Sequence, residues 1–292
     1  MLLAYRRALP LLRIPFSLLL MPVFWFGLSA LRGPLDWGRA AGVFVILHLL
    51  VYPASNSYNS YYDRDEGSIG GLERPPPVTP ELLRLVRGFD AAALLAAFGL
   101  GGWSFAALIT LYLLVSKAYS YDHIRLKKYP LLSTAVVVVF QGAYTFLLVQ
   151  AGAGASAGQL FEKTNLLLAF VSTLFLCGSY PLTQIYQHQE DARRGDHTLS
   201  RRLGIRGTFV FAALGLLAGV VAMSLAYWLR GEPRYILVFL AGVGPVLALF
   251  GRWAWLAWHK PALANYRWLM RLNRVSAVCL SVAFVVLLFL RG

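Results

Sequence analysis

Charged side chains are scarce in this chain of 292 residues, because Asp, Glu, Lys and Arg together make up only 14% of it. A soluble domain of this length carries about a quarter charged residues. The deficit excludes an ordinary soluble enzyme or binding domain. Hydrophobic residues make up 58% of the chain and come in long runs. Such runs predict helices that cross a membrane.

Cysteine and acidic residues are also few. The two cysteines, Cys177 and Cys279, both lie within apolar runs, which excludes a disulfide framework or a zinc site and favours packing roles. Lys and Arg number 27 against 13 Asp and Glu, which gives a formal net charge of +14. These basic residues flank the apolar runs and form no separate basic domain. We therefore expect no nucleic-acid partner and interpret the charges as topology signals of a membrane protein.

The apolar runs predict an all-α integral membrane protein with nine transmembrane helices. We place the spans at residues 10–31, 40–62, 88–102, 103–121, 130–151, 165–187, 206–229, 234–258 and 268–290. The first span lacks a small-residue cleavage site and is expected to be retained. The third and fourth spans meet at the glycine-rich stretch 99–102 and should form a tight antiparallel hairpin. No low-complexity linker divides the chain, so residues 1–292 are expected to form a single domain.

Lys and Arg gather in one set of connections, namely the N-terminal segment and the loops after spans two, four, six and eight. The positive-inside rule places this set in the cytoplasm, together with the N-terminus, and leaves the C-terminus outside. The chemically interesting polar clusters lie in the same loops. We therefore expect a multi-pass protein of the bacterial inner (cytoplasmic) membrane, surrounded by membrane lipids, with its active site facing the cytoplasm.

The first polar cluster closes span two. Asn56, Asn59 and Asp63 follow i, i+3 and i+7 spacing, so they share one face if the helix continues to its end. Amide and carboxylate oxygens are hard ligands suited to Mg²⁺, and Asp65 adds negative charge just beyond. The alternative is a solvated helix end rich in turn-forming residues.

The second polar cluster repeats this pattern at the end of span six. Gln187 and Asp191 are four residues apart, and Glu190 lies three residues after Gln187, so all three can share a helix face. A capped helix end followed by a mixed-charge loop is again the alternative. Two such clusters on the same predicted side of the membrane make the metal-binding interpretation stronger than either cluster does alone.

A basic segment closes span four and continues into the next loop. Arg125, Lys127 and Lys128 can contact a polyanion, and Arg74 from the first loop can join them. Topology signalling and contact with lipid headgroups are the alternatives for any single one of these residues. Lys117 differs because it lies inside an apolar span, where it must face a cavity, extend to the membrane surface or pair with another group.

Together these groups predict a diphosphate site at the membrane surface. Acidic and amide groups facing each other can hold Mg²⁺, and the nearby cations can hold phosphate oxygens. The apolar interior below them can accept a long hydrocarbon tail. Bound metal and cations would stabilise the charge that develops on a departing diphosphate.

Three segments occur in a characteristic order. The first, from Asn59 to Gly67, reads NSYYDRDEG and is followed by Arg74-Pro75. The second runs from Tyr119-Ser120 through RLKK, residues 125–128, to residue 130, a proline. The third, residues 187–195, reads QHQEDARRG and is followed by TL at 198–199 and LG at 203–204. This ordered set resembles the motifs of the UbiA-type intramembrane prenyltransferase superfamily, and the resemblance covers nearly the whole chain.

The resemblance implies a nine-helix bundle around a central cavity and Mg²⁺-dependent transfer of a prenyl group from an isoprenoid diphosphate. The acceptor is expected to be an aromatic or other lipid-soluble molecule, as in the synthesis of quinones, pigments or lipids. Asp63 and Asp191 are then the expected catalytic residues, with Tyr119 and Tyr121 shielding an allylic cation. The expected metal ligands are Asn59, Asp63, Gln187 and Asp191, supported by Asp65 and Glu190, and the expected diphosphate-binding residues are Arg74, Arg125, Lys127 and Lys128.

The chain departs from the family pattern at three positions. Ser60 and Gly67 stand where the first motif usually has aspartates, and Gln187 stands where the second motif has one. Menaquinone-type members share glycine at the position of Gly67. The neutral amide of Gln187 brings less charge to a metal than a carboxylate does, and Asp65, Glu66 or Glu190 could compensate for it.

Other functions stay open at this point. A catalytically degenerate membrane protein that binds or carries isoprenoid diphosphates fits the same residues. A transporter is disfavoured because the polar groups lie at only one membrane face. A phospholipid-type phosphotransferase is disfavoured because its Asp-Gly…Ala-Arg…Gly…Asp…Asp run is absent from the sequence.

Overall fold

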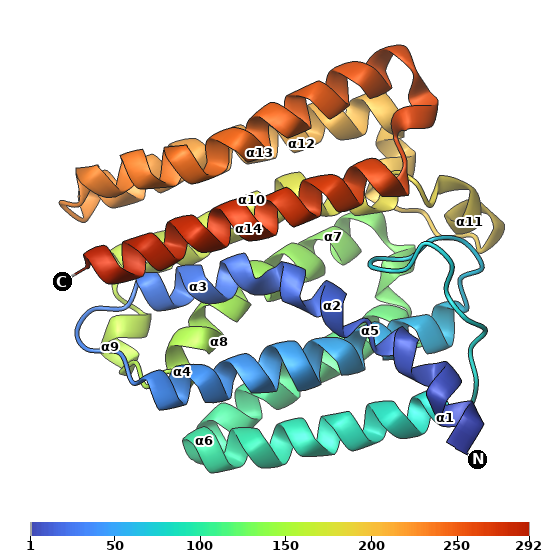
Figure 1. Ribbon diagram of the computed structural model, residues 1–292, viewed down its shortest axis with the longest axis horizontal. Coiled ribbons are helices and arrows are strands. Elements are labelled where there is room, and N and C mark those ends of the chain that lie inside the picture. The colour runs from blue at the N-terminus through green and yellow to red at the C-terminus, as the bar shows by residue number, and fades with distance from the viewer. Residues whose placement is uncertain (1, 292) are drawn as a thin grey trace.

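The computed structural model describes residues 2–291, and the side chains of residues 5–291. Within these residues the chain is helical, and its only β-type pairing is an isolated antiparallel bridge between Ile69 and Leu72. The long helices run roughly along one axis, and the N- and C-termini lie at opposite ends of the molecule (Figure 1). The long apolar runs account for this architecture, because a helix satisfies its own backbone hydrogen bonds inside a membrane.

The elements follow one another along the chain with few long connections. The first half contains α1 (Leu2–Ala8), η1 (Leu9–Leu12), α2 (Ile14–Ser17), η2 (Leu18–Leu20), α3 (Met21–Ser29), α4 (Trp37–Phe44), a π-helical segment η3 (Val45–Val51), α5 (Tyr52–Asp63), α6 (Glu81–Ser120), η4 (Leu126–Lys128) and α7 (Pro130–Val139). The second half contains a π-helical segment η5 (Phe140–Tyr144), α8 (Thr145–Gly152), α9 (Ala157–Leu160), α10 (Lys163–Gln184), α11 (His188–Arg193), α12 (Leu199–Leu229), α13 (Pro233–His259), η6 (Pro261–Leu263) and α14 (Tyr266–Leu290).

Eight helical stretches of residues 2–291 are long and apolar enough to cross a membrane. These stretches are those of an integral multi-pass membrane protein, and they lie at the positions where the sequence analysis placed its spans. The predicted count of nine is not confirmed, because the span expected at 88–102 and all but the last residue of the span expected at 103–121 fall within α6, which is a single element of 40 residues.

The α6 element nevertheless reverses direction, as predicted for its glycine-rich centre. Gly101 and Gly102 have non-helical backbone angles, and Gly102 adopts φ +63°, a conformation that glycine takes without a Cβ clash. The Nζ of Lys117 lies 2.7 Å from Oδ2 of Asp90. Residues this far apart along one straight helix would be separated by roughly 40 Å, so the two halves of α6 form a hairpin. Asp90 is thus the partner of the intramembrane lysine.

Breaking the Lys117–Asp90 pair on one side only is expected to destabilise the protein. Lys117→Met leaves the Asp90 carboxylate unpaired between helices, which costs on the order of 3 kcal/mol of unfolding free energy. The double variant Lys117→Met/Asp90→Leu removes both charges and should recover most of that loss. Thermal unfolding in detergent tests this, and equal destabilisation by the single and double variants would contradict it.

Close helix packing positions the wall that carries the later motif. A Cβ on Gly178 of α10 would lie 2.8 Å from the backbone nitrogen of Leu216, and one on Gly215 of α12 would lie 2.7 Å from the Cα of Gly178. Small residues at these positions let α10 and α12 approach backbone to backbone, as in other membrane helix pairs. The polar residues next to Gly178 on α10 are held in place by this contact.

Both motif loops lie at the same end of the bundle, on the right in Figure 1 near α11. The chain reaches that end at the close of α5 and again at the close of α10. The side of the membrane that this end faces is not fixed by the structure, and the cytoplasmic orientation stays a prediction from the positive-inside rule.

Candidate active site

The loop after α5 contacts the segment that contains α11. The backbone N–H of Glu66 donates to Oε1 of Glu190 at 2.8 Å, and the guanidinium of Arg194 lies 3.3 Å from Oδ1 of Asp65. Gln187 also donates from Nε2 to the carbonyl of Ser68 at 3.4 Å. The two oxygen-rich segments, which are more than a hundred residues apart in sequence, therefore converge on one another.

The first segment keeps its predicted helical form to its last residue. The α5 helix ends at Asp63 because Arg64 takes a left-handed conformation, with φ 49°, and its N–H donates to the carbonyl of Ser60. Asn56, Asn59 and Asp63 all line one cavity, which confirms that they share a helix face. Oδ1 of Asn59 accepts a hydrogen bond from the Ser120 hydroxyl at 3.0 Å, and this bond fixes the orientation of the amide.

The second segment differs from its predicted form. Span six was expected to continue to residue 187, but α10 ends at Gln184 and a separate short helix, α11, begins at His188. Gln187 lies at the start of α11, and the N–H of Asp191 donates to its carbonyl at 2.9 Å. The two residues are therefore still one helical turn apart, and both line the cavity. The break between the helices redirects this turn toward the first segment.

A carboxylate that the sequence analysis missed organises the basic residues. Asp196 is fully buried and accepts from Nε and an NH2 group of Arg125 at 3.2 and 3.1 Å. The Nζ of Lys127 lies 3.1 Å from Asp196 and 2.7 Å from Oδ1 of Asp63. Burial opposes ionisation of Asp196, but the hydrogen bonds and charges of Arg125 and Lys127 outweigh it and lower its pKa. The only feature of the sequence that could have pointed to Asp196 is its position directly after Gly195, at the end of the third motif segment.

A cavity of about 430 Å³ opens below the converging segments. Its charged lining residues are Arg13, Asp63, Asp65, Lys127, Asp191 and Asp196. Most of its remaining lining is apolar, and near the opposite end of the bundle the rings of Phe26 and Phe284 stack at 4.7 Å. The size lies within the usual range of ligand sites. A polar mouth above an apolar interior suits an amphipathic ligand.

The predicted site residues divide into three groups. Those that line the cavity are Asn59, Asp63, Asp65, Tyr119, Lys127, Gln187 and Asp191. Arg125 and Glu190 do not line it: Arg125 lies 4.0 Å from the cavity-lining Asp63, and Glu190 lies 3.9 Å from Arg194, which in turn contacts the cavity-lining Asp65. Arg74 and Lys128 are exposed, and Tyr121 packs edge-on against Tyr62 at 5.5 Å, away from the cavity lining.

Gly67 lies against Glu190. A Cβ at Gly67 would lie 2.8 Å from Oε2 of Glu190, so the carboxylate of Glu190 occupies the space that a side chain at 67 would need. An aspartate side chain at position 67 would clash with the carboxylate of Glu190 and would also be repelled by its negative charge. Glu190 thus places an acidic group beside the position where the first motif lacks its last aspartate.

Arg13 is a second residue that the sequence analysis missed. It interrupts the first span with a left-handed backbone, φ 49°, and its guanidinium donates to the carbonyls of Asn56 and Gly70 at 2.6 and 3.3 Å. Arg13 lines the cavity, and among the described residues it has no ion-pair partner. Its positive charge therefore reaches the mouth without being held in an ion pair, and it faces a lining that contains four aspartates.

A family model for the UbiA prenyltransferase family matches residues 19–275. The chain belongs to this family. The fold agrees with solved UbiA-type structures: an apo UbiA homologue from Aeropyrum pernix K1 has a TM-score of 0.71 at 16% identity, covering 94% of this chain and 98% of that one. A UbiA homologue from Archaeoglobus fulgidus, bound to GPP and Mg²⁺, has a TM-score of 0.66 at 17% identity, covering 96% and 99%.

A third structural match concerns a digeranylgeranylglyceryl phosphate synthase, with a TM-score of 0.59 at 16% identity, covering 97% of this chain and 99% of that one. No curated protein matches this chain. The structural likenesses establish the fold, and the family model establishes membership in a family of prenyltransferases.

The donor set of this UbiA-family protein fits Mg²⁺. Among the described residues, no group of three or more His, Cys, Asp or Glu side chains forms a metal cage. Mg²⁺ does not need one, because it is commonly held by one or two carboxylates together with substrate phosphates and water. Burial raises the pKa of Asp65 to about 6, with repulsion from Asp63 adding to the shift, and burial also raises the pKa of Asp191 to about 6. Negative charge is thus costly here, and a divalent cation would relieve that cost.

Metal binding by the UbiA-family site is expected to weaken as the pH falls through about 6. Asp65 and Asp191 have a pKa of about 6, so both are mostly ionised at pH 7.5 and mostly protonated at pH 5, and a protonated carboxyl is a poor ligand. Titration with Mn²⁺, followed by its electron paramagnetic resonance signal, should show affinity falling at least about tenfold between pH 7.5 and 5. Constant affinity over this range would contradict the assignment of these carboxylates.

Proposed function

We propose that this protein transfers a prenyl group from an isoprenoid diphosphate to a lipid-soluble acceptor in a Mg²⁺-dependent reaction. The observation that carries the proposal is the convergence of the two oxygen-rich segments, through the bond between Glu66 and Glu190, above an apolar cavity. Family membership supports prenyl transfer in general. The homologue bound to GPP and Mg²⁺ supports the same ligand class.

The diphosphate would bind at the mouth, between the metal ligands and the buried cations. Asn59, Asp63, Gln187 and Asp191 would hold Mg²⁺, with Asp65 and Glu190 supporting. Lys127 and Arg13 line the cavity and would bind phosphate oxygens directly. Arg125 is held in two hydrogen bonds to Asp196, so it would act mainly by fixing the Asp196–Lys127 pair. Arg74 and Lys128 would contact the outer face of the diphosphate.

The reaction would break the bond between C1 of the prenyl group and the diphosphate oxygen, with the electron pair leaving on the diphosphate. Bound Mg²⁺ would supply positive charge for this leaving group. The acceptor then forms a bond to C1 and releases a proton to solvent at the mouth. Tyr119 and Tyr180, whose hydroxyls lie 2.6 Å apart, present aromatic rings beside that point and would shield the allylic cation from water. Tyr121 packs against Tyr62 outside the cavity lining, so we propose no direct role for it in shielding the cation.

The prenyl tail would lie in the apolar part of the cavity, toward Phe26 and Phe284. The positive-inside pattern supports a mouth that faces the cytoplasm. We propose the bacterial inner membrane as the location, with the whole chain forming one domain around the site.

Diphosphate release is the direct test. Purified protein in detergent is mixed with geranyl diphosphate, an acceptor mixture and either Mg²⁺ or a chelator, and released diphosphate is measured. The proposal predicts release only with Mg²⁺ and only when an acceptor is present. Diphosphate release at equal rates with Mg²⁺ and with the chelator would contradict it.

A degenerate protein that binds the diphosphate without turnover is the second candidate. Gln187 favours it, because the amide replaces a carboxylate and donates to the backbone of Ser68. Tight Mg²⁺-dependent binding of geranyl diphosphate without any diphosphate release would support this candidate over the enzyme.

A further inference from the structure

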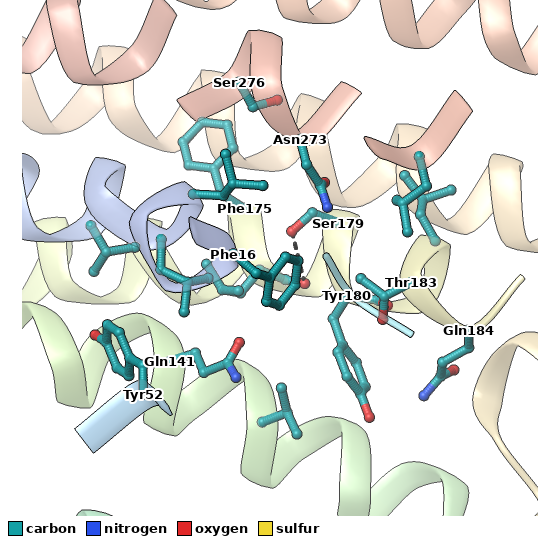
Figure 2. Close-up of a pocket in the computed structure, with 18 of the residues that line it drawn as sticks. Phe16, Tyr52, Gln141, Phe175, Ser179, Tyr180, Thr183, Gln184, Asn273 and Ser276 are labelled. Atoms are coloured by element: carbon teal, nitrogen blue, oxygen red, sulfur yellow. Dashed lines mark hydrogen bonds between the residues drawn. The ribbon is translucent and has the colours of Figure 1, made fainter. Parts of the chain in front are cut away.

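A second polar zone lies inside the cavity, away from the charged mouth. It is formed by Gln141 on η5, Ser179 on α10, and Asn273 and Ser276 on α14. Figure 2 shows Asn273, Ser276 and Ser179 on one side of the cavity and Gln141 across from them. Counting the helical rise from the mouth end, Asn273 lies roughly 10 Å and Gln141 roughly 15 Å inside the bundle. A diphosphate bound at the mouth, as proposed above, would not extend this far.

The two amides in this zone have unused hydrogen-bonding capacity. Neither the side chain of Gln141 nor that of Asn273 is hydrogen-bonded to another residue in the part of the chain described (Figure 2). A polar amide inside a membrane protein costs free energy when it faces hydrocarbon, and such residues are usually retained for a bound partner. A prenyl tail has no group to pair with them. The zone therefore suits a ligand other than the tail.

The backbone around Gln141 is fixed. It lies in the π-helical turn Phe140–Tyr144, a type of turn that is frequent at functional sites. The next residue, Gly142, packs so closely on α10 that a Cβ would lie 2.7 Å from the Cα of Thr173. The N–H of Ala143 also donates to the Thr173 hydroxyl at 3.1 Å. This contact holds the turn that directs Gln141 into the cavity.

The zone is uncharged. The charged residues that line the cavity are those of the mouth, where Lys127 contacts Asp63 and Arg13 reaches the loop at Gly70. Around Gln141 and Asn273 the other polar lining groups are the hydroxyls of Ser179, Thr183 and Ser276 and the amide of Gln184, all of them uncharged (Figure 2). Without a cation nearby, a carboxylate or phosphate placed here would be buried unpaired, which is strongly unfavourable. A neutral ligand with hydroxyl or carbonyl groups avoids that cost.

We infer that Gln141 and Asn273 bind the prenyl acceptor, and that this acceptor is a neutral molecule carrying hydroxyl or carbonyl groups. The inference rests on the proposed function, because it names the second substrate of the same site. Asn273, Tyr119 and Tyr180 line the same cavity, so we expect a molecule the size of one or two aromatic rings, hydrogen-bonded to Asn273, to extend to the Tyr119–Tyr180 pair. Its nucleophilic atom then lies where C1 of the prenyl group is released.

Equilibrium binding tests this without relying on turnover. The probes are 1,4-dihydroxynaphthalene as a neutral ligand, 4-hydroxybenzoate as an anionic one, and geranyl diphosphate with Mg²⁺. The parent should bind the neutral probe at least tenfold more tightly than the anionic one. Gln141→Leu and Asn273→Leu should each weaken binding of the neutral probe about tenfold and leave the Kd for geranyl diphosphate within twofold. Ser224→Ala is the control, because this intramembrane hydroxyl donates to Val220 within α12 at 2.9 Å and does not line the cavity.

The possible outcomes separate the two proposals. Unchanged affinity for the neutral probe in both leucine variants, or a preference of the parent for the anionic probe, overturns the inference. Equal losses for all three probes also overturn it, because they indicate a structural role. Failure of the parent to bind geranyl diphosphate contradicts the proposed function instead, whatever the neutral probe does. Asn273→Ser, which keeps a hydrogen-bonding group, should lose less affinity than Asn273→Leu.

Discussion

Replacing Asp63 or Asp191 by asparagine is expected to lower kcat/KM for prenyl transfer by at least about a hundredfold. Each change keeps the size of the side chain but removes a negative charge from the mouth, where one carboxylate comes from each motif. Losing a group that holds the charge of a departing anion typically costs a factor of 10² to 10³. The measurement is diphosphate release from geranyl diphosphate with saturating Mg²⁺ and acceptor.

Asp122→Asn is the matched control for these variants. Asp122 also contacts Arg125, at 3.1 Å, but its side chain is 63% exposed and it does not line the cavity. We expect this variant to keep activity within about threefold of the parent. If the parent is active and both Asp63→Asn and Asp191→Asn keep its full activity, these two carboxylates are not the catalytic residues of the mouth, and the account is contradicted.

Asp196→Leu is expected to destabilise the fold by about 3 kcal/mol. The carboxylate is fully buried. It accepts hydrogen bonds from Arg125 and forms an ion pair with Lys127. Removing it leaves two cations close together with too little negative charge, and breaking one side of a buried ionic network typically costs this much. Thermal unfolding in detergent should show a midpoint lower by several degrees.

Asp122→Leu provides the comparison for stability. It removes an exposed carboxylate from the same arginine, and surface changes of this kind usually stay within about 0.5 kcal/mol. Equal unfolding midpoints for the Asp196→Leu and Asp122→Leu variants would show that the buried network does not stabilise the protein in the way described.

Much of the helical framework could be predicted from the sequence because membrane spans depend on local composition. Apolar runs of about 20 residues suffice to place a transmembrane helix, and the glycine-rich centre of α6 indicated the hairpin that the Lys117–Asp90 pair confirms. The break between α10 and α11 was missed. It lies between Gln184 and His188, where no glycine or proline marks the end of a helix.

The site was predicted only in part because helix rotations and long-range contacts are not visible in a sequence. The spacing of Asn59 and Asp63 gave their common face, which the cavity lining confirms. The roles of Arg13 and Asp196 depend on partners from distant segments, such as Gly70 and Arg125. Gln141 lies in an apolar run and Asn273 lies between two arginines, Arg271 and Arg274, so neither residue forms a motif in the sequence, and only the folded chain places them around one cavity.

The effect of Mg²⁺ on the affinity for geranyl diphosphate tests the central claim most directly. Calorimetric titration of the parent with geranyl diphosphate, in Mg²⁺ and in chelator, measures whether the two motif segments and the diphosphate share one metal ion. We predict that Mg²⁺ tightens the Kd at least tenfold in the parent and not in the Asp63→Asn/Asp191→Asn double variant. The same Kd in Mg²⁺ and in chelator for the parent would contradict the account.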